Sequence, residues 1–176
     1  GYNYFKNLLF ALNQLEDNEL DIYVFTGKKT DSDIKNMFSQ YATVIESSIF
    51  DRRSIMWFIS KIEQRFFSTN FMMENLLNKY HLEILSHSSL INIKGIKIIN
   101  WIPDFQHIHL PHMFSEKQIK QRNHSFMKII KNSDAIVLSS NDALGDFRSF
   151  APGYDHKVTV LRFVSQPIAR YSNLNG

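Results

Sequence analysis

The chain has 176 residues, of which 44% are hydrophobic, and this suits one globular domain with a sizeable core. It contains no cysteine, which excludes disulfides, zinc-thiolate sites and thiol catalysis and leaves histidine, carboxylate and hydroxyl chemistry. The formal charge is only +3, from 20 Lys and Arg against 17 Asp and Glu, so we predict no nucleic-acid partner.

No apolar run approaches the roughly 20 residues that span a bilayer, and the N-terminus lacks a charged start followed by an apolar core. We therefore expect neither an anchor nor a signal peptide, and we predict a cytoplasmic location. The chain opens at Gly1 and Tyr2, directly before a helical pattern. This suggests that an upstream segment or a first strand is not included.

Helical and strand patterns alternate along the chain, which predicts a three-layer α/β fold with a mostly parallel sheet. A first helix has one face made by Leu8, Leu9, Leu12 and Leu15. The elements expected after it are a strand at 21–26, a helix from 30, a strand at 42–45, helices at 54–67 and 71–80, strands at 82–85 and 96–102, a helix at 116–131, a strand at 134–140, a short helix from 141 and a strand at 157–163. We predict a Rossmann-like domain of about six strands over 1–164 and a linker over 165–176.

Two of these helices begin at the spacing of a capping box, in which a hydroxyl and an acidic or amide side chain three residues later exchange hydrogen bonds with the backbone. Thr30 and Asp33 have this spacing, and so do Ser115 and Gln118. We expect a helix to start at each pair.

A loop dense with polar side chains follows the strand at 96–102. Its polar side chains are Asp104, Gln106, His107, His109 and His112. Ligands of open parallel sheets bind beyond the carboxyl ends of the strands, so a binding or catalytic group is expected here. The alternative is a loop held by aspartate turns with surface histidines. The histidine spacing matches no zinc signature, so no metal site is predicted.

Two other features have a phosphate-binding and a plain structural interpretation. Ser139 and Ser140 follow a buried strand and either hold a phosphate at the next helix or cap that helix, and capping is favoured. Gly1 and Tyr2 before a helix are compatible with the end of a glycine-rich phosphate loop, but one glycine is weak evidence.

Five segments of the chain have a familiar order. They are Gly-Tyr followed by Asn-Leu-Leu within 1–9, Trp-Ile-Pro-Asp-Phe-Gln-His at 101–107, Leu-Pro-x-x-Phe-Ser at 110–115, Asp-Ala-Ile-Val-Leu-Ser-Ser at 134–140 and Lys-Val-x-Val-Leu-Arg-Phe at 157–163. Together they resemble the N-terminal half of GT-B glycosyltransferases, and more narrowly the retaining branch that builds bacterial surface glycans from nucleotide sugars. The resemblance covers residues 1 to about 164.

This resemblance implies a two-domain enzyme with a cleft between Rossmann-like halves. The N-terminal half receives a glycan or lipid-linked acceptor, and the C-terminal half holds the nucleotide-sugar donor with a Glu-x7-Glu motif. No two glutamates here are eight positions apart, so the chain alone is expected to be inactive. Retaining members commonly work without a metal, so neither a metal nor another cofactor is expected.

The resemblance also assigns roles to individual residues. It makes His107 the histidine that contacts the donor sugar, with His109 as the nearest competitor, and lets Asp104 orient the imidazole or bind an acceptor hydroxyl. The predicted catalytic residues are thus His107 and Asp104. The predicted substrate-binding residues are Gly1, Tyr2, Gln106, His109, Ser139, Ser140 and Arg162.

Two other classes of function remain open. A stand-alone small-molecule binding or sensing module on the same sheet would need no second domain. Peripheral membrane or partner docking is suggested by the Arg52–Ile59 segment and by the basic residues of the 116–131 helix. In the 54–67 helix we expect a core-facing stripe, with other apolar residues off it. The stripe is Ile55, Phe58, Ile59, Ile62 and Phe66, and the others are Met56, Trp57 and Phe67.

Overall fold

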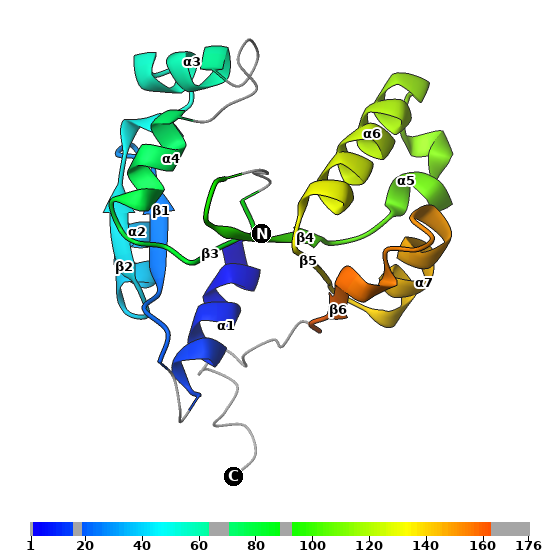
Figure 1. The fold of residues 1–176 in the computed structure, drawn as a ribbon, viewed down its shortest axis with the longest axis horizontal. Coiled ribbons are helices and arrows are strands. Elements are labelled where there is room, and N and C mark those ends of the chain that lie inside the picture. The colour runs from blue at the N-terminus through cyan, green and yellow to red at the C-terminus, as the bar shows by residue number, and fades with distance from the viewer. Residues whose placement is uncertain (1, 16–18, 64–70, 89–92, 163–176) are drawn as a thin grey trace. The chain divides into compact units, whose positions relative to one another are not determined.

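The computed structural model describes residues 2–15, 19–63, 71–88 and 93–162 (Figure 1). The chain divides into two compact units, which we call the first unit, Gly1–Met73 with Phe163–Gly176, and the second unit, Glu74–Arg162. In the described part of the chain, no helix is long and apolar enough to cross a bilayer.

The first unit contains a small parallel sheet. Its elements are α1 (Tyr2–Asn13), β1 (Tyr23–Thr26), α2 (Ser32–Ser39), β2 (Thr43–Glu46), the 3-10 helix η1 (Ser48–Phe50), α3 (Ile55–Ile62) and the start of α4 (Phe71–Asn78). β1 and β2 pair in parallel, with Tyr23 opposite Thr43. The Asp31 carboxylate starts α2 because it accepts a 2.8 Å hydrogen bond from the backbone N–H of Asp33. The expected start at Thr30 is therefore one residue early.

The second unit is built on four parallel strands in the order β3-β4-β5-β6. Its elements after α4 are β3 (Ile84–Ser86), β4 (Lys97–Ile102), α5 (Gln106–His109), the 3-10 helix η3 (Pro111–Met113), α6 (Glu116–Asn132), β5 (Ala135–Leu138), α7 (Asn141–Phe150), the 3-10 helix η4 (Asp155–Lys157) and β6 (Val158–Val160). The order advances one strand at a time, so right-handed connections place α6 and α7 on one face.

That face carries the core of the second unit. Ile136 and Leu138 alternate along β5 and point to the same side, where Ile130 of α6 and Phe147 of α7 pack on them. All four side chains are fully buried. Ile102 of β4 lies opposite Leu138 in the register and joins the same cluster. The core therefore fixes the carboxyl ends of β4 and β5. The loops that form the candidate site begin at these ends.

The α/β class and the parallel strands are confirmed, since each of the six expected runs forms a parallel strand. The expectation of one sheet of about six strands is wrong for the described residues, which form a two-stranded and a four-stranded sheet. Periodicity identifies strands by their burial pattern. Which strand pairs with which depends on contacts far apart in the chain, and these are not visible in a local pattern.

The start of α6 is confirmed in detail. The Ser115 hydroxyl accepts from the backbone N–H of Gln118 at 3.3 Å, and the Gln118 side chain accepts from the backbone N–H of Ser115 at 2.8 Å. The stretch before it, expected to be a loop, contains the single-turn helix α5 and the 3-10 helix η3. Short turns of this kind carry no hydrophobic period that a sequence pattern could show.

The expectation that the apolar stripe of α3 faces the core is wrong. Ile55 is 78% exposed, Phe58 52% and Ile62 51%, and no residue of α3 is buried. The helical period correctly places these side chains on one face, but it carries no information on what covers that face. Phe66 and Phe67 lie outside the described residues.

Candidate functional site

The loops that follow β4 and β5 meet at the carboxyl edge of the four-stranded sheet. The Ser139 hydroxyl, just beyond β5, donates a hydrogen bond to the backbone carbonyl of Pro103, just beyond β4. Asp104 is the next residue along the chain. The structure therefore brings the predicted Asp104 and Ser139 segments together, as expected from parallel strands whose ends share one edge.

Asp104 acts on the backbone of its own turn. Its half-buried carboxylate accepts a 3.1 Å hydrogen bond from the backbone N–H of Gln106, the first residue of α5. This is an aspartate turn, which fixes the direction in which the chain leaves β4. The Gln106 side chain is exposed.

His107 lies inside the second unit, where it is 1% exposed. Its Nε2 lies 2.8 Å from Oδ1 of Asn123 on α6, and the amide oxygen can only accept, so Nε2 carries the proton. The ring packs against Phe105, Phe126 and Phe150. Nδ1 has no hydrogen-bond partner among the described residues. Asn123, and not Asp104, therefore orients this imidazole, and its burial gives His107 a packing role in this structure.

His109, two residues further on, has the opposite environment. Its side chain is 61% exposed, and its Nε2 lies 2.7 Å from Oδ1 of Asp146 on α7. In the neutral tautomer that donates Nε2–H to this carboxylate, Nδ1 is an acceptor. The Asp146 carboxylate behind the imidazole also orients the ring. The pair is therefore suited to accept a proton from, or hydrogen-bond to, a hydroxyl that approaches from solvent.

Apolar side chains surround His109 along the chain. Ile108, Leu110 and Met113 are all exposed, as is His112. A short segment therefore presents imidazole and apolar groups together at the carboxyl edge of the sheet. Such a mixture suits a ligand that has both hydroxyl groups and apolar surface.

The remaining predicted residues are placed as follows. The Ser140 side chain caps α7 by accepting from the backbone N–H of Ala143 at 3.1 Å, so the capping interpretation is confirmed for it. Arg162 lies beyond β6 and is exposed. Gly1 and the side chain of Tyr2 lie outside the described residues. Among the residues that are described, no three His, Asp or Glu side chains are grouped to hold a metal ion.

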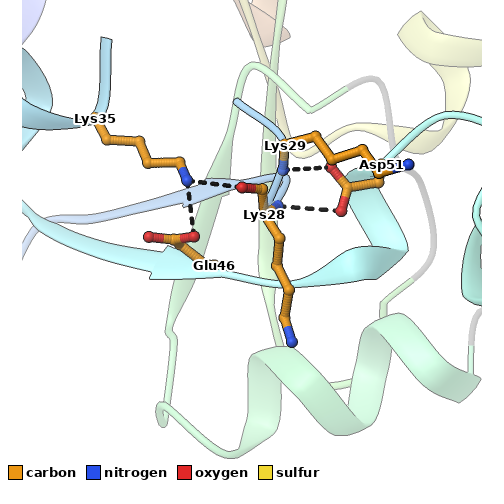
Figure 2. A network of polar contacts seen from close by, with 5 residues as sticks. All are labelled: Lys28, Lys29, Lys35, Glu46 and Asp51. Carbon is orange, nitrogen blue, oxygen red and sulfur yellow. Dashed lines mark hydrogen bonds and ion pairs between the residues drawn. The ribbon is translucent and has the colours of Figure 1, made fainter. Parts of the chain in front are cut away.

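The corresponding loop of the first unit, which follows β1, is closed by its own groups. The buried Asp51 carboxylate accepts hydrogen bonds from the backbone N–H groups of Lys28 at 3.1 Å and Lys29 at 2.9 Å (Figure 2). A Cβ on Gly27 would lie 2.3 Å from Oδ1 of Asp51, so only glycine admits this approach. Two backbone donors that could hold an anion are already taken by a carboxylate of the chain itself.

Lys35 closes the other side of the same loop. Its ammonium group donates to the backbone carbonyl of Lys28 and pairs with the Glu46 carboxylate, both at 2.8 Å (Figure 2). The loop after β1 is therefore a structural clamp, and we assign no ligand to it.

A hollow of about 460 Å³ lies at the amino edge of the second unit's sheet, opposite the candidate site. Two of its charged side chains, Lys157 and Asp134, are engaged within the protein. The Lys157 ammonium donates to three carbonyls at the end of α6, the nearest that of Ser133 at 2.8 Å. The Asp134 carboxylate accepts from the backbone N–H of Ile98 at 2.9 Å. The Lys157 contacts cap the end of α6, and the Asp134 contact joins the start of β5 to β4, so both side chains have structural partners.

The sequence analysis did not identify the hydrogen-bond partners of the two histidines, His107 and His109. Asn123 lies 16 positions from His107, and Asp146 lies 37 positions from His109. Both stand on helices at ordinary polar positions and no motif marks them. Only the packing of α6 and α7 beside α5 brings them to the imidazoles.

Searches against protein-family models, curated proteins and solved structures found no match to this chain.

Proposed function

We propose that this chain is the acceptor-side domain of a retaining GT-B glycosyltransferase, with its Rossmann-like domain over residues 1–164. The enzyme would move a sugar from a nucleotide-sugar donor to a glycan or lipid-linked acceptor. The order of the five sequence segments supports this proposal. The parallel α/β architecture and the polar loop at the carboxyl edge of the sheet are compatible with it.

The observation that carries the proposal is the His109–Asp146 pair. It is accessible, it is held at 2.7 Å, and exposed apolar side chains lie beside it. An acceptor hydroxyl that reaches Nδ1 of His109 would be oriented and polarised for attack on the donor sugar. The apolar side chains of Ile108 and Leu110 would contact the lipid or the apolar face of a sugar ring.

The donor side is expected to lie outside this chain, because the Glu-x7-Glu motif is absent. The chain alone should therefore transfer no sugar and bind nucleotide sugars weakly. We propose that the reaction uses neither a metal nor another cofactor, and that positive charge offsets the leaving diphosphate.

Acceptor binding tests the proposal directly. The 176-residue chain is titrated with short-chain alkyl glycosides while the histidine ring signals are followed by NMR. We expect the His109 and His112 signals to shift in the parent, and the His112 shift to be lost in His109→Ala. The matched control is His156→Ala, which removes another exposed histidine from η4 and should change nothing.

Calorimetric titration with a panel of nucleotide sugars completes the test. Weak or undetectable binding is expected. Submicromolar affinity for a nucleotide sugar, or absence of any alkyl-glycoside effect on His109, would contradict the proposal. The former result would favour a stand-alone small-molecule binding module.

A further inference from the structure

We propose that the exposed face of α3 docks this protein onto an anionic membrane surface. The face consists of Ile55, Phe58, Ile59 and Ile62, which are 78%, 52%, 42% and 51% exposed. At 100° per residue these four side chains fall within about 100° of arc, as in helices that lie in the plane of a membrane interface. We call this face the α3 apolar face.

The α3 apolar face points away from the contacts that hold the helix. The Ser54 hydroxyl caps α3 by accepting from the backbone N–H of Trp57 at 3.0 Å, and it donates to the Ser48 carbonyl of η1. Trp57 and Ser60, on the opposite side of the helix, are half-buried. The helix is therefore attached through its less apolar side, and its most apolar side meets solvent.

Positive charge stands at one end of the same helix. Arg52 and Arg53 immediately precede the cap, both are exposed, and neither forms an ion pair with a described residue. The neighbouring Asp51 carboxylate forms no ion pair with them and is instead buried on the N–H groups of Lys28 and Lys29.

These arginines do not serve the helix itself. The N-terminal end of a helix is the positive end of its dipole, so a cation there is unfavourable. α3 itself contains no acidic residue. Apolar side chains next to a pair of cations match a surface that offers acyl chains beneath phosphate groups, which is an anionic bilayer.

This inference does not depend on the proposed glycosyltransferase activity, because it rests on α3 alone. It would place a domain that uses a lipid-linked acceptor at the surface that contains the acceptor. Acceptor binding in the NMR titration is measured without vesicles, so either proposal can fail while the other holds.

The test is co-sedimentation of the full 176-residue chain with vesicles of phosphatidylcholine containing 30 mol% phosphatidylglycerol. We expect binding at low salt that falls as salt is added and is much weaker with pure phosphatidylcholine. Phe58→Ser/Ile62→Ser should abolish it. The matched control, Ile84→Ser/Leu161→Ser, removes comparably exposed apolar side chains from the second unit and should bind as the parent does.

The charge contribution is tested with Arg52→Gln/Arg53→Asn, in which asparagine suits the left-handed backbone at position 53, where φ is 70°. We expect about 30-fold weaker partitioning, from roughly fivefold for each arginine. Lys117→Gln/Lys120→Gln, which removes the same charge from α6, should have a much smaller effect. Circular dichroism confirms that each variant is folded.

Three outcomes would overturn the proposal. The first is no co-sedimentation of the folded parent at low salt. The second is equal binding to neutral and anionic vesicles with no effect of the arginine substitutions. The third is concentration-dependent self-association in sedimentation velocity that Phe58→Ser/Ile62→Ser removes without a change in vesicle binding, since the face would then serve a second copy of the chain.

Discussion

Each unit has a loop that leaves the carboxyl end of a parallel strand, and the two loops use their polar groups in opposite ways. After β1, the buried Asp51 takes the backbone donors of Lys28 and Lys29. After β4, His109 extends into solvent with its imidazole paired to Asp146. The position in the fold is the same, but the backbone donors of the first loop are occupied, whereas the His109 imidazole of the second loop is exposed.

Topology therefore locates a candidate site, and the partners of its polar groups decide whether a ligand can reach it. A parallel sheet directs its loops to one edge, where backbone donors and polar side chains gather. When a carboxylate from elsewhere in the unit binds those donors, the loop gains stability and loses its capacity for a ligand. Substitutions in each loop should therefore have different consequences, on stability after β1 and on ligand binding after β4.

The largest effect is expected from Gly27→Ala in the closed loop. The added methyl group would lie 2.3 Å from Asp51 Oδ1 and would displace the carboxylate from its two backbone donors. Overpacking and unsatisfied buried N–H groups together should lower the free energy of unfolding by about 3–4 kcal/mol. Denaturant titration followed by Trp57 fluorescence in a Trp101→Phe background reports on the first unit.

A double-mutant cycle shows whether the clash with Asp51 is the cause. In an Asp51→Ala background, Gly27→Ala should cost less than about 1 kcal/mol, because the methyl group then has room. Equal costs in both backgrounds would mean that Gly27 acts through its backbone freedom and not through Asp51.

The next largest effect is expected at His107. His107→Ala should lower the stability of the second unit by about 2–3 kcal/mol, because it leaves a cavity among three phenylalanines and an unpaired Asn123. Trp101 fluorescence in a Trp57→Phe background follows this unit. The opposite result would be an unchanged stability together with a loss of about 100-fold in the turnover of a full-length enzyme that carries His107→Ala. That result would support the predicted catalytic role of His107.

His109 should behave differently from its buried neighbour. His109→Ala should change the free energy of unfolding by less than about 0.5 kcal/mol, because this side chain is 61% exposed. Asp146→Ala, at a half-buried position, should cost no more than about 1 kcal/mol. Both should weaken the alkyl-glycoside effect seen by NMR. A large loss of stability without a loss of binding would make this loop a clamp like the one after β1.

The smallest effect on stability is expected at Asp134. Like Asp51, its carboxylate accepts a hydrogen bond from a backbone N–H group, but its side chain is exposed. The backbone N–H of Ile98, with a smaller contribution from Lys97, holds the pKa of Asp134 below its ordinary value. The stabilisation is therefore present above the unfolded pKa of about 4 and is lost as the pH falls through the folded value. In denaturant titrations, the difference in the free energy of unfolding between the parent and Asp134→Asn should shrink below about pH 4. A difference that stays constant with pH would contradict this role of Asp134.

Much of the fold could be predicted from the sequence. Runs such as Ala135–Leu138 form strands because their apolar residues are contiguous, and Ser115 starts α6 because its hydroxyl and Gln118 satisfy the first backbone donors. These signals act within a few residues. The division into two sheets could not be predicted in the same way, because strand pairing joins residues that are distant in the chain.

Local sequence patterns were sufficient to predict the strand runs, the start of α6, the polar loop after β4 and the common face of the apolar residues of α3. Tertiary structure alone decided that His107 is buried and His109 exposed, since residues two apart on one turn of helix point to different sides and only packing selects the inner one. It also decided that the α3 apolar face meets solvent, because a period places side chains together and the neighbouring elements determine their burial.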